Sequence, residues 1–392
     1  MGLKIINKGN FYSHMFEKNM VPEVYDNIYL SHNKKTIFNN SKIDKLNQKS
    51  IIDAWEYFPS YLTATTLQNL HCNKVFQKLG FAIKLEGVND SLEYLKEQFN
   101  STPRKTFLRS LNRLESSFNI TYKTFYGHIT NEEYSSLMNA LHQMLTKRFQ
   151  QRGDRNKTLE NWEYYSSNFQ SMINEKKGSL FVIYNGVIPI EISINFHYDN
   201  ILYSSISSFD LDYSKFSLGN IEIYKQLDWC IANNIEVFDM GFGDFDYKRR
   251  WSNLIYNFEN HILSTPRNRF SHFYASYLKS KYAFTNYILS SRLIGPYRKL
   301  RMFIKDWKWT EQSVINAYNV EVLDKETNFD LKDCILLTDM EDYSFLNKPL
   351  MDFLYSYKEN FNLVSIYSIP AETDSYLIQG ENSSIKITFK NN

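Results

Sequence analysis

Cysteine is scarce in this 392-residue chain. Its three cysteines, Cys72, Cys230 and Cys334, lie far apart and form no C-x-x-C pair. Their number is odd and their spacing contains no C-x-x-C pair, so neither a disulfide framework nor a zinc knuckle is predicted. The eight histidines show no H-x-x-x-H or histidine–carboxylate spacing, and no metal site is expected.

The chain also lacks long apolar runs and an excess of one charge. No stretch approaches the ~20 apolar residues that a membrane-spanning helix needs, and the N-terminal residues contain no continuous apolar segment like that of a signal peptide. These patterns predict a cytoplasmic protein. Lysine and arginine number 45 against 43 aspartates and glutamates, a balance that does not indicate DNA binding.

What the sequence does have is enough apolar and aromatic residues, 43% and 16%, for a large core. Residues 179–251 are the most informative part. Asn185-Gly186 stands between two apolar runs and predicts a β-hairpin. A second turn at Asp199-Asn200, a loop, a helix, a strand over residues 235–240 and a charged loop follow.

The remaining elements are predicted as follows. Short strands are expected at residues 3–9, 27–33 and 35–40, and helices at 50–62 and 67–80. Ser101-Thr102-Pro103 is typical of a helix start, and two more helices are expected over residues 131–152 and 159–177. The tail to residue 392 alternates strand-like runs with one helix near 349–360.

Three motifs together carry a resemblance to a known family. They are Tyr213–Gly219 before the helix, Asp239–Asp244 after the strand, and Tyr247–Trp251. In these residues, and over about residues 100–265, the chain resembles the GNAT superfamily of acyltransferases. Within it the chain is similar to bacterial CelD/BcsL-like proteins, with their BioF2-like acetyltransferase domain, and more distantly to FemAB aminoacyl transferases.

The resemblance implies the fold class and the domains. We expect an α/β (α+β) protein with a GNAT-like mixed sheet flanked by helices and two GNAT-like halves. The expected domains are a degenerate first half over residues 1–125, the acyltransferase domain over 126–265, a basic helical segment over 266–310 and a small α+β appendage over 311–392.

The resemblance also implies an acyl-CoA as co-substrate. The helix that starts near Asn220 offers free backbone N–H groups and a positive dipole end, which suit a pyrophosphate, and Gly219 permits close approach. The superfamily's pyrophosphate pattern falls on residues 214–219, with serine at its first and fourth positions. An ordinary helix N-cap is the alternative. The predicted donor-binding residues are Ser214, Ser217, Leu218, Gly219 and Asn220.

Four residues are predicted to act in catalysis. Lys248 occupies the lysine position of the FemAB-type motif, where a cation stabilises the negative charge that develops during transfer. Asp239 and Asp244 could orient Lys248 or contact the acceptor, or could cap the loop through its basic residues. Glu191, in the middle of a strand, could be a general base with a pKa adjusted by partial burial. The alternative is a carboxylate on a solvated face or one paired with a nearby arginine.

A row of basic residues lies along one face of the helix that begins near residue 101. Lys105, Arg109 and Arg113 lie four residues apart on one face. We interpret the row as a site for the phosphates of CoA or of a nucleotide-linked acceptor, and a solvated face is the alternative.

The predicted function is an N- or O-acyltransferase that moves an acyl group from acyl-CoA, or a carrier thioester, to an amine or hydroxyl of a sugar, peptide or cell-envelope precursor. The first alternative is a FemAB-like transferase that uses aminoacyl-tRNA, the only case in which tRNA would be a partner. The second is a non-catalytic binding protein of a polysaccharide locus. The sequence makes no prediction of oligomeric state.

Residues 267–308 contain ten basic residues and a single carboxylate, Asp306, among bulky apolar ones. Such a segment can lie on an anionic membrane surface, which would place the protein peripherally at the inner membrane. The favoured alternative is an intramolecular clamp, in which the acidic stretch of residues 321–342 neutralises the basic face.

Overall fold

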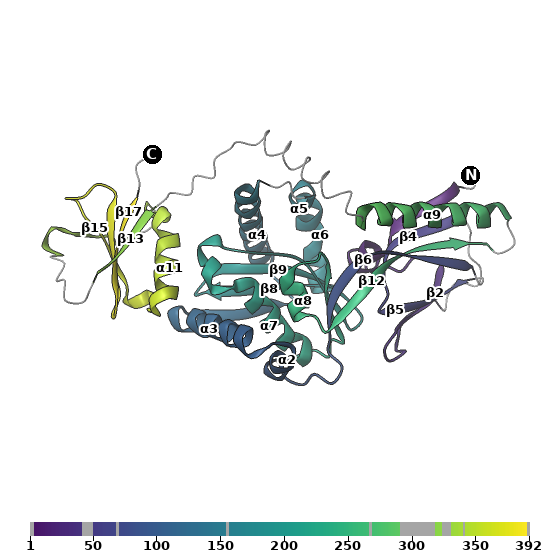
Figure 1. Cartoon of the computed structure of the whole chain (residues 1–392), viewed down its shortest axis with the longest axis horizontal. Helices are drawn as coiled ribbons and strands as arrows, with labels where there is room; N and C mark the ends of the chain where they lie inside the picture. The colour runs from purple at the N-terminus through teal and green to yellow at the C-terminus, as the bar shows by residue number, and fades with distance from the viewer. Residues whose placement is uncertain are drawn as a thin grey trace.

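The computed structural model describes residues 4–40, 50–67, 70–153, 157–265, 269–290, 318–323, 331–339 and 342–389. Its centre is a nine-stranded mixed sheet in the order β1-β4-β12-β6-β11-β10-β9-β8-β7 (Figure 1). Its strands are β1 (Lys4–Asn10), β4 (Ser50–Pro59), β6 (His71–Lys84), β7 (Ile120–Phe125), β8 (Gly178–Asn185), β9 (Ile188–Tyr198), β10 (Ile201–Phe209), β11 (Val237–Phe242) and β12 (Leu254–Ser264).

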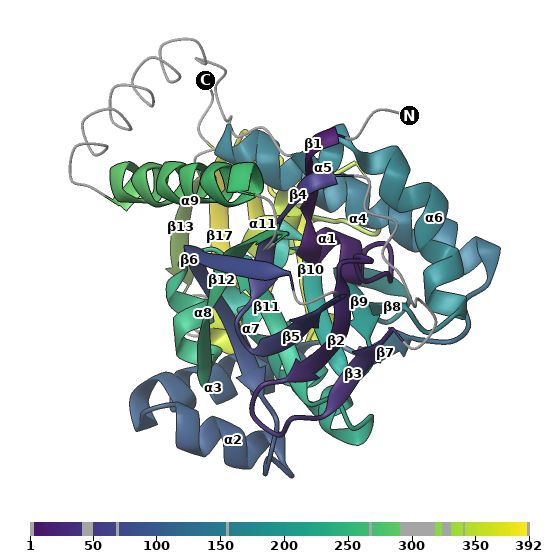
Figure 2. The ribbon, with the colours of Figure 1, turned by 90° about the vertical axis from the view of Figure 1, so that its right-hand side faces the viewer.

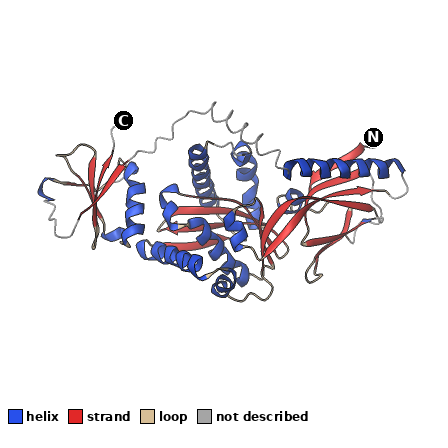
Figure 3. Ribbon diagram, viewed as in Figure 1, coloured by secondary structure: helices blue, strands red, loops and turns tan. Residues whose placement is uncertain are grey.

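Helices cover both faces of the part of this sheet that runs from β11 to β7 (Figure 3). On one face lie α4 (Asn131–Arg152), α5 (Lys157–Glu160) and α6 (Trp162–Asn174); on the other lie α2 (Ser91–Gln98), α3 (Ser101–Ser117) and α7 (Leu218–Ala232). The predicted mixed α/β fold with a large, helix-flanked sheet is therefore confirmed.

The predicted meander is also confirmed, and its turns explain the register. Strands β8, β9 and β10 pair antiparallel in sequence order. Gly186 has φ +59° and Asp199 has φ +49°, the left-handed backbone that two-residue hairpin turns require and that glycine and aspartate tolerate.

The N-terminal region differs from expectation. The segments predicted as helices at residues 50–62 and 67–80 form the strands β4 and β6, which both pair with β12. Four consecutive residues, 52–55 in β4 and 80–83 in β6, are buried, because both strands lie inside the sheet and are covered on both sides. Such runs lose the alternating pattern of a half-exposed strand, so sequence periodicity cannot separate them from a helix.

A smaller sheet and a short helix complete this end. The order β3-β2-β5 joins β2 (Tyr25–Leu30), β3 (Thr36–Asn39) and β5 (Leu62–Thr66). Between β1 and β2 lies α1 (Phe11–Phe16), whose buried Phe11 and Phe16 belong to a core shared with residues of α4 and α6. The N-terminal region and the meander are therefore packed into one hydrophobic core.

The C-terminal part follows α9 (Arg269–Ser290). It is an antiparallel sheet in the order β13-β17-β16-β15-β14, with α11 (Asn347–Tyr357) against α3 and the 3-10 turn η2 (Leu211–Phe216). The strands are β13 (Tyr318–Leu323), β14 (Ile335–Leu336), β15 (Ser365–Ser368), β16 (Ser375–Gln379) and β17 (Ser384–Phe389).

Helix α9 and the C-terminal sheet lie at opposite ends of the molecule (Figure 1). In the described part of the chain, no helix is long and apolar enough to cross a membrane. The four domain ranges stay predictions; β7, which precedes the boundary expected at residue 125, pairs with β8, which follows it.

Candidate active site

Strands β10 and β11 are parallel neighbours that separate. They pair only from Ile201 with Val237 to Tyr203 with Asp239, although β10 continues to Phe209 and β11 to Phe242. Past this point a pocket of about 590 Å³, called here the splay pocket, opens between the two strands and α7. It is lined by Arg148, Tyr203, Ser204, Ser205, Ser207, Phe209, Ser214, Ser217, Leu218, Gly219, Asn220, Glu222, Ile223, Met240, Gly241, Phe242, Tyr247 and Lys248.

All of the predicted donor-binding residues line this pocket. Ser217 has φ +60°, which turns the chain from η2 into α7, and its carbonyl accepts hydrogen bonds from the N–H groups of Asn220 (2.9 Å) and Ile221 (3.2 Å). Leu218 and Gly219 are the first two residues of the helix, whose N–H groups have no carbonyl one turn earlier within it. A Cβ added at Gly219 would meet no atom within 4 Å, so the approach to these groups is open.

Arg148, which sequence reasoning did not single out, brings a cation to the same pocket from α4. Its Nη1 donates a hydrogen bond to the carbonyl of Ser207 (3.2 Å), and its guanidinium lies 5.3 Å from the ring centre of Phe209. Burial lowers the pKa of Arg148 from its ordinary value. The guanidinium thus binds β10 where that strand has lost its β11 partner.

Lys248 lines the pocket from the short helix α8 (Asp246–Trp251). Its Nζ donates hydrogen bonds to the carbonyls of Met240 (2.5 Å) and Phe242 (2.7 Å). These carbonyls flank Gly241, which has φ +69° and lies where the pairing of β11 with β6 shifts. Burial lowers the pKa of Lys248 to about 8. Two of the three ammonium N–H groups therefore hold the irregular end of β11, and one remains.

Asp239 is fully buried next to this bend. Its carboxylate accepts hydrogen bonds from the hydroxyls of Tyr61 and Tyr256 (each 2.8 Å) and from the N–H of Gly241 (2.7 Å). Burial raises the pKa of Asp239, while these hydrogen bonds oppose the rise. No hydrogen bond joins Asp239 to Lys248 in the described residues; the carboxylate acts on the lysine only through its charge, which favours the ammonium form. The catalytic role of Asp239 stays a prediction.

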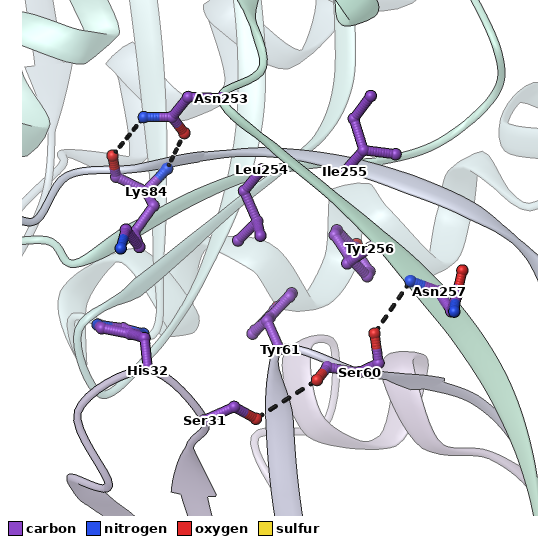
Figure 4. A pocket seen from close by; sticks show the side chains of 10 residues that line it. All are labelled: Ser31, His32, Ser60, Tyr61, Lys84, Asn253, Leu254, Ile255, Tyr256 and Asn257. Atoms are coloured by element: carbon purple, nitrogen blue, oxygen red, sulfur yellow. Dashed lines mark hydrogen bonds between the residues drawn. The ribbon is translucent and has the colours of Figure 1, made fainter.

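Tyr61 and Tyr256 also line a second pocket of about 430 Å³ (Figure 4). Its other wall residues include Ser60 and Asn253. The side chain of Asn253 binds the backbone of Lys84 through both its oxygen (2.7 Å) and its nitrogen (2.9 Å), which fixes the wall between β6 and β12. The tyrosine hydroxyls at Asp239 therefore connect this second pocket with the bend of β11 that lines the splay pocket.

Two buried glutamates meet beside the splay pocket. Ser207 Oγ lies 3.3 Å from Glu191 Oε1 and 2.8 Å from Glu222 Oε2, and Gln226 donates a 2.7 Å hydrogen bond to the other oxygen of Glu222. Burial raises the pKa of Glu222 to about 7. It raises that of Glu191 well above the ordinary range, and the neighbouring Glu222 raises it further. One hydroxyl proton serves only one carboxylate, and Glu191 Oε2 has no hydrogen-bond partner among the described residues, so the cluster favours a protonated Glu191 beside a titrating Glu222.

The expectation of a partly buried Glu191 is wrong in this respect. The side chain is fully buried and does not line the splay pocket, because α7 covers this face of β9. Glu222, which does line it, was missed by sequence reasoning. Its signal was a carboxylate between Ile221 and Ile223 in a helix whose neighbouring positions are apolar.

The other predicted residues lie outside the pocket. Asp244 is exposed and forms a two-pronged ion pair with Arg249, one contact of which is 2.6 Å. Lys105 and Arg109 are exposed on α3, and Arg113 lies 4.6 Å from the ring centre of Tyr355 on α11. None of these four lines the splay pocket, and the anion-binding role of the α3 row stays a prediction. No group of metal ligands is present in the parts of the chain that the structure describes.

Comparisons with known proteins give one family match and several similar solved structures. Residues 101–249 match the acetyltransferase (GNAT) domain family, whereas no curated protein matches the chain. Similar solved structures include a conserved protein of unknown function from Bacteroides thetaiotaomicron, at 6% identity and TM-score 0.37 over 50% of this chain and 64% of that one. The chain thus spans less than two thirds of that protein.

FemX is also similar, with 10% identity and TM-score 0.39 over 55% of this chain and 72% of FemX. A tandem GNAT protein from the clavulanic acid biosynthesis pathway has 8% identity and TM-score 0.29 over 56% of this chain and 66% of that one. The separating strands β10 and β11 and the start of α7 between them all lie within residues 101–249. This part of the chain is therefore similar to GNAT-type acetyltransferase domains.

Proposed function

We propose that the protein is an N- or O-acyltransferase that moves an acyl group from acyl-CoA to an amine or hydroxyl of a sugar or cell-envelope precursor. The observation that carries the proposal is the separation of β10 from β11 over the start of α7. It supplies together an opening between strands for a thioester arm and helix N–H groups for a pyrophosphate. The acceptor class rests on the resemblance to CelD/BcsL-like proteins.

The pocket offers groups for each step of such a transfer. As the acceptor attacks the thioester carbonyl, a new C–N or C–O bond forms, the acceptor loses a proton and the C–S bond breaks. We assign the proton to Glu222, whose pKa of about 7 lets it accept one near neutral pH. Lys248 supplies positive charge for the oxygen or sulfur that becomes negative, and the departing thiolate takes up a proton from solvent.

A thermal-shift experiment tests the donor. Acetyl-CoA or a longer acyl-CoA at ~100 times its Kd is expected to raise the Tm by about 2 °C or more, because it binds only the folded protein. A shift with aminoacyl-tRNA and none with any acyl-CoA would favour the FemAB-like alternative. No shift with either donor would contradict the proposal and leave a non-catalytic binding protein.

Gly219→Val tests the donor contact at α7. The added side chain would enter the open space in front of the first helix N–H groups. The Kd for acyl-CoA, measured by calorimetry, is expected to rise about tenfold or more, or about 1.4 kcal/mol. The Tm without ligand should change little, since the new Cβ meets no protein atom within 4 Å. Unchanged affinity in the folded variant would remove this assignment, and Gly219→Ala should lie between the two.

Glu222→Gln tests the proton acceptor. The wild-type kcat is expected to rise with pH through about 7, because Glu222 must be ionised to accept a proton. In Glu222→Gln this rise of kcat with pH should disappear. Its kcat should be about 100-fold lower than that of the wild type, which is the usual effect of removing a general base.

Glu191→Gln separates the two candidate bases. Glutamine resembles a protonated Glu191, so this variant should keep the titration near pH 7 and most of its kcat. If the rise of kcat near pH 7 disappears in Glu191→Gln but remains in Glu222→Gln, Glu191 is the base and the assignment is reversed. Both profiles are measured at saturating donor with folding checked by circular dichroism.

A further inference from the structure

Helix α9 packs against the sheet through a narrow face whose buried apolar residues are an alanine and a leucine. Ala275 and Leu278 are buried against residues of β4, β6 and β12, with the half-buried Tyr274 and Tyr282 beside them. The views in Figures 1 and 2 both show α9 lying along the outside of these strands, with its other side turned away from the protein.

That other side carries large aromatic residues. Phe270, Phe273, Tyr277, Phe284 and Tyr287 are between 53% and 75% exposed. They follow one another at spacings of three, four, seven and three residues, which places them in one stripe along the helix. An ordinary surface helix buries its apolar residues and turns a polar face to solvent. Helix α9 instead buries an alanine and a leucine and exposes five aromatic rings, which is unusual for a surface that binds nothing.

The charge of α9 has a single sign. It contains Arg269, Lys279 and Lys281, all exposed, and no aspartate or glutamate. Strand β13, which contains Glu321 from the acidic stretch, lies at the opposite end of the molecule from α9 (Figure 1), so these two described parts do not meet. For the rest of residues 267–308 and 321–342 the clamp stays a prediction. Within the described ranges, no ion pair joins α9 to residues 321–342. Three further basic residues of the segment 267–308, Arg298, Lys299 and Arg301, lie outside the described residues.

We propose that α9 binds the surface of a lipid bilayer that carries anionic headgroups. The aromatic stripe would enter the boundary between headgroups and acyl chains, where the amphipathic rings of tyrosine and the apolar rings of phenylalanine are favoured. Arg269, Lys279 and Lys281 would contact the headgroups, and no carboxylate of the helix opposes them. The helix lies on the bilayer and does not cross it. This inference goes beyond acyl transfer and does not depend on it.

Vesicle co-sedimentation of the full chain tests the proposal. Vesicles of phosphatidylcholine with 30% phosphatidylglycerol should pellet the protein at ~50 mM salt, and binding should fall as salt screens the charges. Phe273→Ser with Phe284→Ser is expected to lower the partition coefficient about tenfold or more, and Lys279→Gln with Lys281→Gln by a similar factor. Pure phosphatidylcholine should bind more weakly.

Val187→Ser with Ile188→Ser is the matched control. These residues are 90% and 60% exposed at the turn between β8 and β9, so the pair removes as many exposed apolar side chains elsewhere on the surface. Its vesicle binding should equal that of the wild type. Absence of binding to anionic vesicles at low salt would overturn the proposal. So would a dimer, seen by light scattering, that the α9 phenylalanine variant dissociates, since the stripe would then bind a second copy.

Discussion

Lys248→Met is expected to lower kcat about 100-fold or more while the Kd for the acyl donor changes much less. Removing a preorganised cation from the site of developing negative charge costs about 3 kcal/mol in the transition state, and the loss falls on kcat. Methionine has similar length and suits the buried environment of this side chain. Steady-state kinetics with donor affinity measured separately checks the expectation.

The same substitution should lower the free energy of unfolding, because it leaves the carbonyls of Met240 and Phe242 without the lysine as donor. The cost is about 1–3 kcal/mol. Arg250→Met on the same helix is the matched control, since Arg250 is exposed and its side chain is outside the splay pocket. Full kcat in folded Lys248→Met would show that Lys248 only holds the end of β11.

The ionisation of Lys248 gives this prediction a pH signature. Its pKa of about 8 means that the ammonium form is lost as pH rises through that value. A cationic role therefore requires kcat to fall above pH 8, so that with Glu222 the profile is bell-shaped between about 7 and 8. Burial makes the folded state hold the Lys248 proton less tightly than the unfolded chain does, so the free energy of unfolding rises as pH increases from 8 toward 10.5.

Asp239→Ala is expected to lower the free energy of unfolding by about 3–5 kcal/mol, which is the scale for removing one partner of a buried charged network. Alanine would leave the hydroxyls of Tyr61 and Tyr256 and the N–H of Gly241 without their acceptor, and the side chains of both tyrosines are buried. Urea unfolding at pH 7 measures the loss.

Tyr256→Phe provides the control for Asp239. It removes one donor and keeps the ring and the other two hydrogen bonds, so a loss of about 1 kcal/mol is expected. In the double variant the two losses should not add, because they break the same network. A stability loss below 1 kcal/mol in Asp239→Ala would show that water replaces the carboxylate and that the cluster is not closed.

The parts of the site that come from neighbouring residues in the sequence could be predicted. A helix start after a short loop indicated Ser214, Ser217, Leu218, Gly219 and Asn220, and the family resemblance implied Lys248. The structure places these six residues around one pocket. Arg148 and Glu222 were missed because nothing near them in the sequence shows that α4 and α7 converge on β10. Tyr61 was missed for the same reason, since 178 residues separate it from Asp239.

The fold was predicted best where the turn residues are distinctive. The turns Asn185-Gly186 and Asp199-Asn200 predict the meander and its strand pairing, whereas the pattern of residues 50–62 and 67–80 predicts helices where the structure has β4 and β6. Their conformation is determined by pairing with β12, which is about 200 residues away in the sequence. Sequence periodicity contains no information about such a partner.

The hydrogen bonds of Asp239 set the limits of the smallest part of the chain that can fold by itself. One donor, Tyr61, precedes residues 101–249 and another, Tyr256, follows them, while β6, the neighbour of β11, also lies before residue 101. Expressed alone, residues 101–249 would expose the edge of β11 to solvent and to other chains. Asp239 would also lose the hydrogen bonds from Tyr61 and Tyr256. The segment that matches the family by sequence is thus smaller than the cooperative unit, and truncation at its borders should give aggregates instead of a folded protein.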